Sequence, residues 1–231
     1  TILLLTLILS ATLFSKSWVS IDSNTPQDAR KRLVSQDSYS NTIHFELDGF
    51  WLEKVGSDSE DIFSVDVDEG IPLLEKGSPD LEKLVTSVII PEDGLMDFEI
   101  VDSKYKEYSD VLLAPSKGSL LRNVNPSSIP LEYNDVYNTN DFFPGKLAEL
   151  SDPYILRDFH GQTLIVYPFQ YNPISNILRV YSELTVKVFS NSNAYNQSLL
   201  RNSNESNSIS SEFAHMYSSH FINYDSEQSR Y

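Results

Sequence analysis

The tripeptide Leu-Leu-Arg at 120–122 is the part of this sequence best suited to chemistry on another protein. Two aliphatic side chains followed by a guanidinium suit a cleft in a partner protein, because a buried carboxylate can hold a guanidinium through two charge-assisted hydrogen bonds. The tripeptide lies in APSKGSLLRNVNPSSIP, residues 114–130, whose three prolines and one glycine favour a long, stiff loop. By residue type alone, a solvated surface arginine is the commoner alternative. The candidate loop residues are Lys117, Leu120, Leu121, Arg122 and Asn123.

Several kinds of catalytic chemistry are excluded within this chain. It contains no cysteine, which rules out a disulfide, a zinc-thiolate site and a thiol nucleophile. The four histidines show no metal-ligand spacing, since His215 and His220 would point to different sides of a helix. The acidic residues between 58 and 69 lack the Asp-x-Asp-x-Asp-Gly pattern of a calcium loop and are typical of a solvated strand edge. We therefore expect no catalytic residue, no metal and no cofactor.

The charge balance restricts the partners of the chain. It has 33 acidic and 17 basic residues, which give a formal net charge of −16. Nucleic acids and anionic membrane surfaces are bound by clustered lysine and arginine, because binding then releases counterions from phosphates. The sequence therefore disfavours both, and a basic or metal-bearing partner fits it better.

Alternating hydrophobic residues predict most of the fold. Residues 43–47, 63–67 and 96–100 alternate apolar and polar side chains, which is the period of a half-buried strand. Residues 177–189 extend this pattern furthest, and the Tyr-Asn-Pro turn at 171–173 favours a hairpin. Short strands separated by Gly, Pro, Asn and Asp, without helical runs between them, point to an all-β sandwich.

The two ends of the sequence differ from this β-rich centre. The first residues are apolar over a stretch shorter than the roughly 20 residues that a membrane span needs, which favours a signal peptide. Near the other end, apolar residues recur at helical spacing after a Ser/Asn-rich tract, which predicts a short helix packed on the sandwich or on a partner. The expected segments are a signal-peptide fragment at 1–17, a flexible lead-in at 18–41, the sandwich at 42–190, a mobile linker at 191–208 and the helix at 209–225.

Four longer sequence words suggest a family. They are DVLLAPSKG at 110–118, DFFPGKLAELSDPYILRD at 141–158, PFQYNP at 168–173 and LRVYSELTVKV at 178–188, with a weaker likeness in EKGSPDLEKL at 75–84. In order and spacing these words resemble the prodomain of the gingipain family of cysteine endopeptidases. Two positions depart from the family pattern, because His160 stands where an arginine is expected and Glu82 where a proline is usual.

The resemblance implies a compact β-sandwich with jelly-roll character that covers the protease cleft, keeps the zymogen latent and assists its folding. It aligns Arg122 with the arginine that blocks the S1 pocket in that family. It also places a maturation junction at 226–231, where cleavage after Arg230 would leave Tyr231 as the first residue of the mature enzyme. A chain that stops there for an unrelated reason is the alternative. Both arginines favour an enzyme that prefers Arg to Lys at P1.

The implied partner is the catalytic domain of the cysteine protease encoded downstream, and the chain itself is expected not to be an enzyme. The implied route is export to the periplasm and then to the extracellular space or cell surface, without stable membrane insertion once the signal is removed. A secreted β-sandwich that binds carbohydrate or a surface partner is the alternative, because aromatic residues such as Phe142, Tyr154 and Tyr167 could form a sugar-stacking platform.

Overall fold

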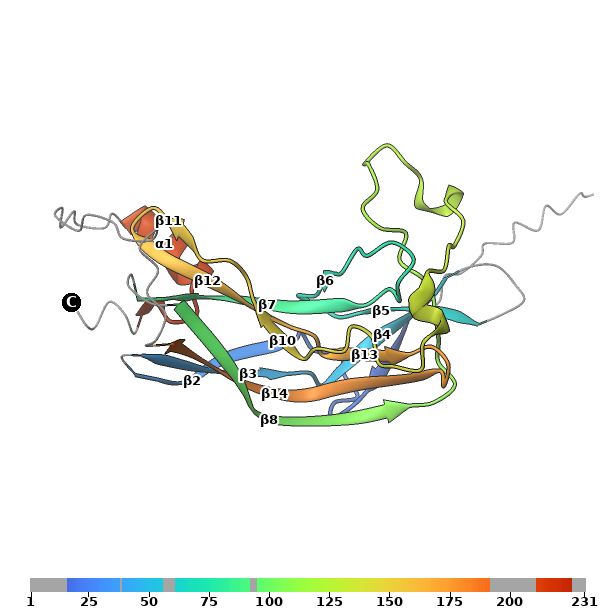
Figure 1. Ribbon diagram of the computed structural model, residues 1–231, viewed down its shortest axis with the longest axis horizontal. Helices are drawn as coiled ribbons and strands as arrows, with labels where there is room; N and C mark the ends of the chain where they lie inside the picture. Colours follow the sequence, from blue (N-terminus) through green and yellow to red (C-terminus); the bar gives the residue numbers. More distant parts are fainter. Residues whose placement is uncertain (1–15, 38, 56–60, 92–94, 192–210, 226–231) are drawn as a thin grey trace, which may run out of the picture.

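The structure is a computed structural model that describes residues 16–37, 39–55, 61–91, 95–191 and 211–225. In these residues the chain forms a sandwich of mainly antiparallel sheets, with a short helix towards one end and a long loop that rises towards the other (Figure 1). The all-β sandwich predicted from the alternating pattern is therefore confirmed. The expected signal peptide, linker and maturation junction fall almost entirely outside the described residues.

One five-stranded sheet is organised around β14 (Ile177–Asn191) and forms the lower layer in Figure 1. On one side β14 pairs with β8 (Leu95–Tyr108), and on the other it pairs with β13 (Phe169–Asn172) and β3 (Ser40–Glu46). β2 (Arg30–Gln36) pairs with β3 and ends the sheet. The side chains of β14 that were predicted to face the core are at most 2% exposed, namely Leu178, Val180, Leu184, Val186 and Val188.

Two further sheets complete the sandwich. The first contains β10 (Ala148–Leu150), β12 (Phe159–Val166), β7 (Glu82–Ile89) and β6 (Ile71–Pro72), with β11 (Tyr154–Leu156) paired to β12. The second contains β1 (Lys16–Ser20), β4 (Gly49–Lys54), β5 (Ile62–Asp66) and β9 (Leu112–Leu113), and its β5–β9 pair is parallel. Buried residues from all three sheets belong to one hydrophobic core.

A flexible lead-in is expected at 18–41, but the structure has two paired strands in this region, β1 and β2. β1 is antiparallel to β4, and Trp18 meets Trp51 edge to face with ring centroids 5.2 Å apart. The expected signal boundary after residue 17 falls inside this strand. β2 is an edge strand, and its Arg30 pairs with Glu46 at 2.8 Å. An edge strand with an exposed face needs few apolar residues, so its sequence shows no clear alternation.

The predicted C-terminal helix is confirmed as α1 (Ser211–His220), and it packs on the sandwich. We name residues 211–225 the C-terminal clamp. Its residues Tyr217, Phe221 and Tyr224 are at most 3% exposed and surround the ring of Phe159. Gly161 permits this close packing, because a Cβ at that position would lie 2.6 Å from a ring carbon of Phe221. Aromatic burial therefore holds the end of the chain.

A buried asparagine adds polar contacts to the clamp. Asn223 is fully buried, its Oδ1 accepts a hydrogen bond from the Ile89 N–H at 2.8 Å, and its Nδ2 donates to the Ile89 carbonyl at 3.0 Å. The N–H of Ile222 donates to the Ser87 carbonyl at 3.0 Å. The clamp thus completes the hydrogen bonding of β7 where that strand has no other neighbour for these groups.

Candidate functional site

The predicted loop stands out from the sandwich. We name residues 114–134 the projecting loop, which follows β9 and precedes the short 3-10 helix η2 (Asp135–Asn138). Figure 1 shows it rising away from the sheets, towards the opposite end of the long axis from α1. Leu121 in this loop is 74% exposed, the largest exposed fraction among the exposed large hydrophobic residues of the described chain. Such a side chain adds little to folding and is available to a partner.

Arg122 and Asn123 occupy the centre of a β-turn at the tip of this loop. The N–H of Val124 donates to the Leu121 carbonyl at 2.9 Å, which closes the turn. Both central residues are exposed. In the described part of the chain, the Arg122 guanidinium has no hydrogen bond or ion pair. The turn therefore presents a free positive charge to solvent.

Both limbs of the projecting loop are hydrogen-bonded to residues 75–80, which we name the base segment. On the entry limb, the Ser116 N–H donates to the Ser78 carbonyl at 2.8 Å, and the Gly77 N–H donates to the Ser116 carbonyl at 2.9 Å. On the exit limb, the Asn134 N–H donates to the Gly77 carbonyl at 3.0 Å, and its side-chain amide donates to Ser78 Oγ at 2.8 Å. The base segment leads directly into β7, so the loop is tied to the sandwich on both sides.

A lysine joins the two limbs closer to the tip. Lys117 Nζ donates to the Pro126 carbonyl across nine positions at 2.7 Å. Pro126 begins the 3-10 helix η1 (Pro126–Ser128), and the N-cap residue Asn125 accepts the Ser127 N–H through Oδ1 at 3.0 Å. These contacts fix the direction of the Pro126 carbonyl. Lys117 was predicted as part of the site, and its charged end is here engaged within the loop.

The structure brings together most of the predicted loop residues. Leu121, Arg122 and Asn123 lie exposed at the turn, whereas Leu120 is half-buried below them. Arg230 and Tyr231, the predicted processing residues, lie outside the described residues.

Sequence reasoning missed two residues of the site, Asn125 and Asn134, which each cap a short helix. Asparagine directly before proline or aspartate is a turn and cap signal that could have identified both.

Two half-buried carboxyl groups, those of Asp80 and Glu82, lie at the end of the base segment and directly after it. Burial, with Asp66 and Asp80 nearby, raises the pKa of Glu82 to about 7, although its Oε2 accepts the Val67 N–H at 2.7 Å. Burial also raises the pKa of Asp80, and a hydrogen bond with Ser116 opposes this rise. No cysteine nucleophile exists in the chain for either group to activate. Asp80 supports the entry limb of the loop through Ser116, whereas Glu82 binds the backbone of Val67.

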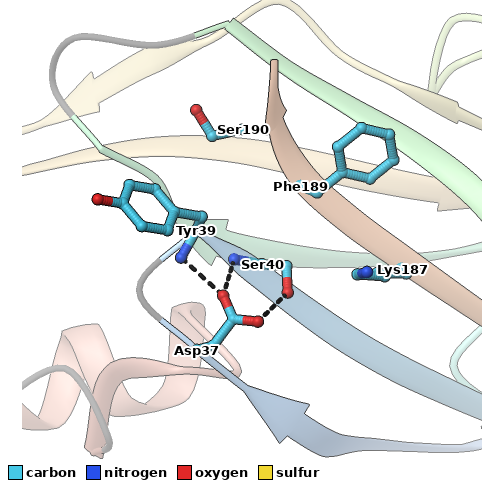
Figure 2. A pocket seen from close by; sticks show the side chains of 6 residues that line it. All are labelled: Asp37, Tyr39, Ser40, Lys187, Phe189 and Ser190. Carbon is cyan, nitrogen blue, oxygen red and sulfur yellow. Dashed lines mark hydrogen bonds between the residues drawn. The ribbon is translucent and has the colours of Figure 1, made fainter. Parts of the chain in front are cut away.

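A hollow of about 360 Å³ lies beside the end of β14 (Figure 2). Its carboxylate belongs to Asp37, which accepts the N–H groups of Tyr39 and Ser40 at 2.8 and 2.7 Å and the Ser40 hydroxyl at 2.8 Å. These hydrogen bonds, led by that from the Tyr39 N–H, lower the pKa of Asp37. A carboxylate occupied by its own turn is a structural group.

The aromatic residues considered for sugar stacking form no such platform in the described chain. Tyr167 and Tyr171 are at most 4% exposed. Tyr154 stacks on Phe221, and the Arg179 guanidinium covers the ring of Phe142 at 4.0 Å. This arrangement disfavours a carbohydrate-binding role.

Metal ligands and membrane-spanning helices are likewise not found in the described ranges. No three His, Asp or Glu side chains there are grouped so that they could hold a metal ion. Within the same ranges, no helix is long and apolar enough to cross a membrane.

Comparison with known proteins identifies the family. A family model described as Propeptide_C25 matches residues 23–230. The chain belongs to the C25 propeptide family. Gingipain R2 of Porphyromonas gingivalis is 39% identical over 195 residues, which are 84% of this chain and 26% of that protein. Gingipain R1 of the same species is 40% identical over 158 residues, which are 68% of this chain and 16% of that protein. The chain therefore spans about a quarter or less of the length of these relatives.

Two solved structures share the fold of this C25 propeptide. In the complex of the Porphyromonas gingivalis RgpB pro- and mature domains, a chain aligns with a TM-score of 0.75 and 37% identity, covering 85% of this chain and 97% of that one. A structure that concerns the zymogenic latency of gingipain K from the same species aligns with a TM-score of 0.64 and 19% identity, covering 76% of this chain and 98% of that one. The second likeness supports the fold alone.

Proposed function

We propose that this propeptide keeps a secreted, Arg-specific cysteine endopeptidase of the gingipain type latent and assists its folding. The partner is the catalytic domain encoded after it in the same precursor. The observation that carries the proposal is the free guanidinium of Arg122, presented by a β-turn on a loop that is tied down on both limbs. The absence of cysteine means that the thiol nucleophile belongs to the partner.

The inhibition follows from the shape and charge of the loop. The Arg122 guanidinium enters the specificity pocket and pairs with its carboxylate, while Leu121 covers the apolar surface beside the pocket. Because the guanidinium has no partner among the residues that the structure describes, binding breaks no contact of Arg122 with them. An interface of standard size, about 1,600 Å² in total, can reach nanomolar affinity, about −12 kcal/mol.

Release of the enzyme uses the same specificity. Cleavage between Arg230 and Tyr231 separates the propeptide from the mature protease, and the matched family range ends at residue 230. The precursor is exported through the periplasm to the extracellular space or cell surface. The apolar residues between 2 and 14 are typical of the hydrophobic part of a signal peptide and support this route.

The test is an inhibition titration of a gingipain-type Arg-specific protease. The propeptide is made from Lys16 to Arg230, because a later start would remove β1. Arg122→Ala should weaken inhibition by about 2–4 kcal/mol if the side chain is a binding hot spot. Arg122→Lys should also weaken it, since an ammonium cannot reproduce the two parallel bonds of a guanidinium.

Arg32→Ala is the matched control, because Arg32 is an exposed arginine on β2, a strand outside the projecting loop. It should inhibit like the wild type. Equal inhibition by wild type and Arg122→Ala would remove Arg122 from the mechanism, and no inhibition by the wild type would overturn the proposed function.

A further inference from the structure

An inhibitory loop that carries the residue preferred by its target enzyme faces a second requirement. If Arg122 fills the S1 pocket, the Arg122–Asn123 peptide bond lies next to the nucleophile. Hydrolysis would consume one water and leave a carboxylate on Arg122 and an amino group on Asn123. In one recurring mode of recognition, which suits a cleft that must reach the peptide main chain, the peptide is bound in an extended form with main-chain hydrogen bonds to an exposed strand. Latency therefore requires that the chain around the Arg122–Asn123 peptide bond does not adopt this extended conformation.

The β-turn at the tip satisfies this requirement as long as it stays closed. The hydrogen bond from the Val124 N–H to the Leu121 carbonyl places the Arg122–Asn123 bond at the centre of a chain reversal. Little packing protects the turn, since Leu121 is 74% exposed. A turn of this kind opens easily unless the chain on its two sides is held together.

Closer to the tip than the base segment, a contact made by Lys117 holds the two sides together. Its Nζ donates to the Pro126 carbonyl at 2.7 Å, and this bond closes a ring around the tip. The same carbonyl accepts the Ile129 N–H at 3.1 Å, so both of its lone pairs are used. Gly118 follows with a φ of +73°, a value that an L side chain rarely adopts, so the backbone next to the lysine has a conformation that favours glycine.

We propose that Lys117 is a positioning residue that makes the projecting loop an inhibitor and prevents it from being a substrate. The inference rests on the proposed function, in which Arg122 occupies the S1 pocket. Lys117 does not touch the reacting bond. It keeps the two limbs at the separation that a closed turn requires, and it withholds from the nucleophile the extended geometry in which attack takes place. Because its ammonium is engaged within the loop, Lys117 does not compete with Arg122 for the pocket.

The test compares cleavage with binding. Lys117→Met keeps the aliphatic stem and removes the donor. A gingipain-type Arg-specific protease should cut Lys117→Met between Arg122 and Asn123 about tenfold faster than wild type, as mass spectrometry of timed samples can measure. The increase should appear in kcat with KM little changed, since the binding side chain is intact. A loss of fold alone would produce cuts at other arginines.

Lys31→Met is the matched control, because Lys31 Nζ also donates to a distant backbone carbonyl, that of Val85, at 3.1 Å, but lies outside the projecting loop. It should be cut at the wild-type rate. A thermal unfolding midpoint for each variant shows whether it is folded. Should Lys117→Met not fold, Asn125→Ala gives the same answer, because it removes the cap that orients the Pro126 carbonyl and should also speed cleavage.

Wild-type cleavage rates in folded Lys117→Met and Asn125→Ala, together with loss of inhibition in Arg122→Ala, would overturn the role of Lys117 and leave the proposed function standing. Unchanged inhibition in Arg122→Ala would overturn the proposed function itself.

Discussion

The projecting loop and the C-terminal clamp are both attached to the sandwich, but by different forces. The clamp buries three aromatic side chains almost completely and a fully buried asparagine beside them. The loop buries little at its tip and is held by hydrogen bonds between backbone groups, short polar side chains and Lys117, and by the Lys76–Glu132 ion pair. Burial of aromatic surface supplies stability, whereas a polar framework supplies shape without hiding the side chains that it presents.

This difference assigns stability to the clamp and leaves the exposed side chains of the loop free for the recognition role proposed above. Changes in the clamp should lower the free energy of unfolding and leave the turn at Leu121–Val124 intact in the molecules that remain folded. Changes at the tip of the loop should alter binding or cleavage at nearly constant stability.

The largest expected effect is in the clamp. Phe221→Ala removes a ring that is 2% exposed and packs against Phe159, and it should lower the free energy of unfolding by about 3–5 kcal/mol. Urea titration followed by fluorescence measures this change. Leu121→Ala at the tip of the loop is the control and should change stability by less than about 0.5 kcal/mol. Similar losses in both variants would break the comparison.

A pair of asparagines sharpens the comparison between the clamp and the loop. Asn223→Ala leaves the buried N–H and carbonyl of Ile89 without their side-chain partners and should cost about 2–3 kcal/mol in the free energy of unfolding. Asn134→Ala in the loop removes contacts of a partly exposed residue, where water can replace them, and should cost about 1 kcal/mol or less. A larger loss of unfolding free energy for Asn134→Ala than for Asn223→Ala in the same denaturation assay would contradict the conclusion that the clamp contributes more stability than the loop.

The smallest expected effect concerns pH and Glu82, the first residue of β7. Burial raises the pKa of Glu82 to about 7 from an ordinary value of 4.5, so the folded chain holds more protons than the unfolded chain between these values. Stability from this group is therefore present at acid pH and is lost as pH rises towards 7. Glu82→Gln keeps an oxygen that can accept the Val67 N–H, and it should stabilise the chain by about 1 kcal/mol above pH 7.

Thermal unfolding of Glu82→Gln and wild type at about pH 5 and pH 8 checks this. The two should differ less at the acid pH. An equal difference at both pH values would show that ionisation of Glu82 is not the cause.

Much of the fold could be predicted because it follows from side-chain periodicity. The alternation in β14 and the helical spacing of Phe213, Tyr217 and Phe221 each reflect one buried face, which a single sequence records directly. The two strands of the expected lead-in could not be predicted in this way. β2 reads Arg-Lys-Arg-Leu-Val-Ser-Gln and is held by pairing with β3, a partner that its own residues do not specify.

The site could be predicted in its position but not in its internal contacts. A run with three prolines and a glycine indicated a stiff loop, and the tripeptide ending in Arg122 indicated its tip. The contacts that fix its shape join residues far apart in the chain, such as Asn134 with Ser78, or depend on the direction of one carbonyl, as in Lys117 with Pro126. Neither kind of contact leaves a periodic signal in a single sequence.

The attachment of both limbs to residues 75–80 has a consequence for a molecule that has been cut at its tip. Because the entry limb and the exit limb each keep their own hydrogen bonds to the same segment, the two new chain ends remain neighbours and gain little freedom. The enzyme can therefore re-form the cut peptide bond far more readily than it could in a flexible peptide, whose two new ends would separate. Two samples, one of intact propeptide and one of propeptide cut at the tip, should reach the same mixture when each is incubated with protease. That mixture should still contain intact chain.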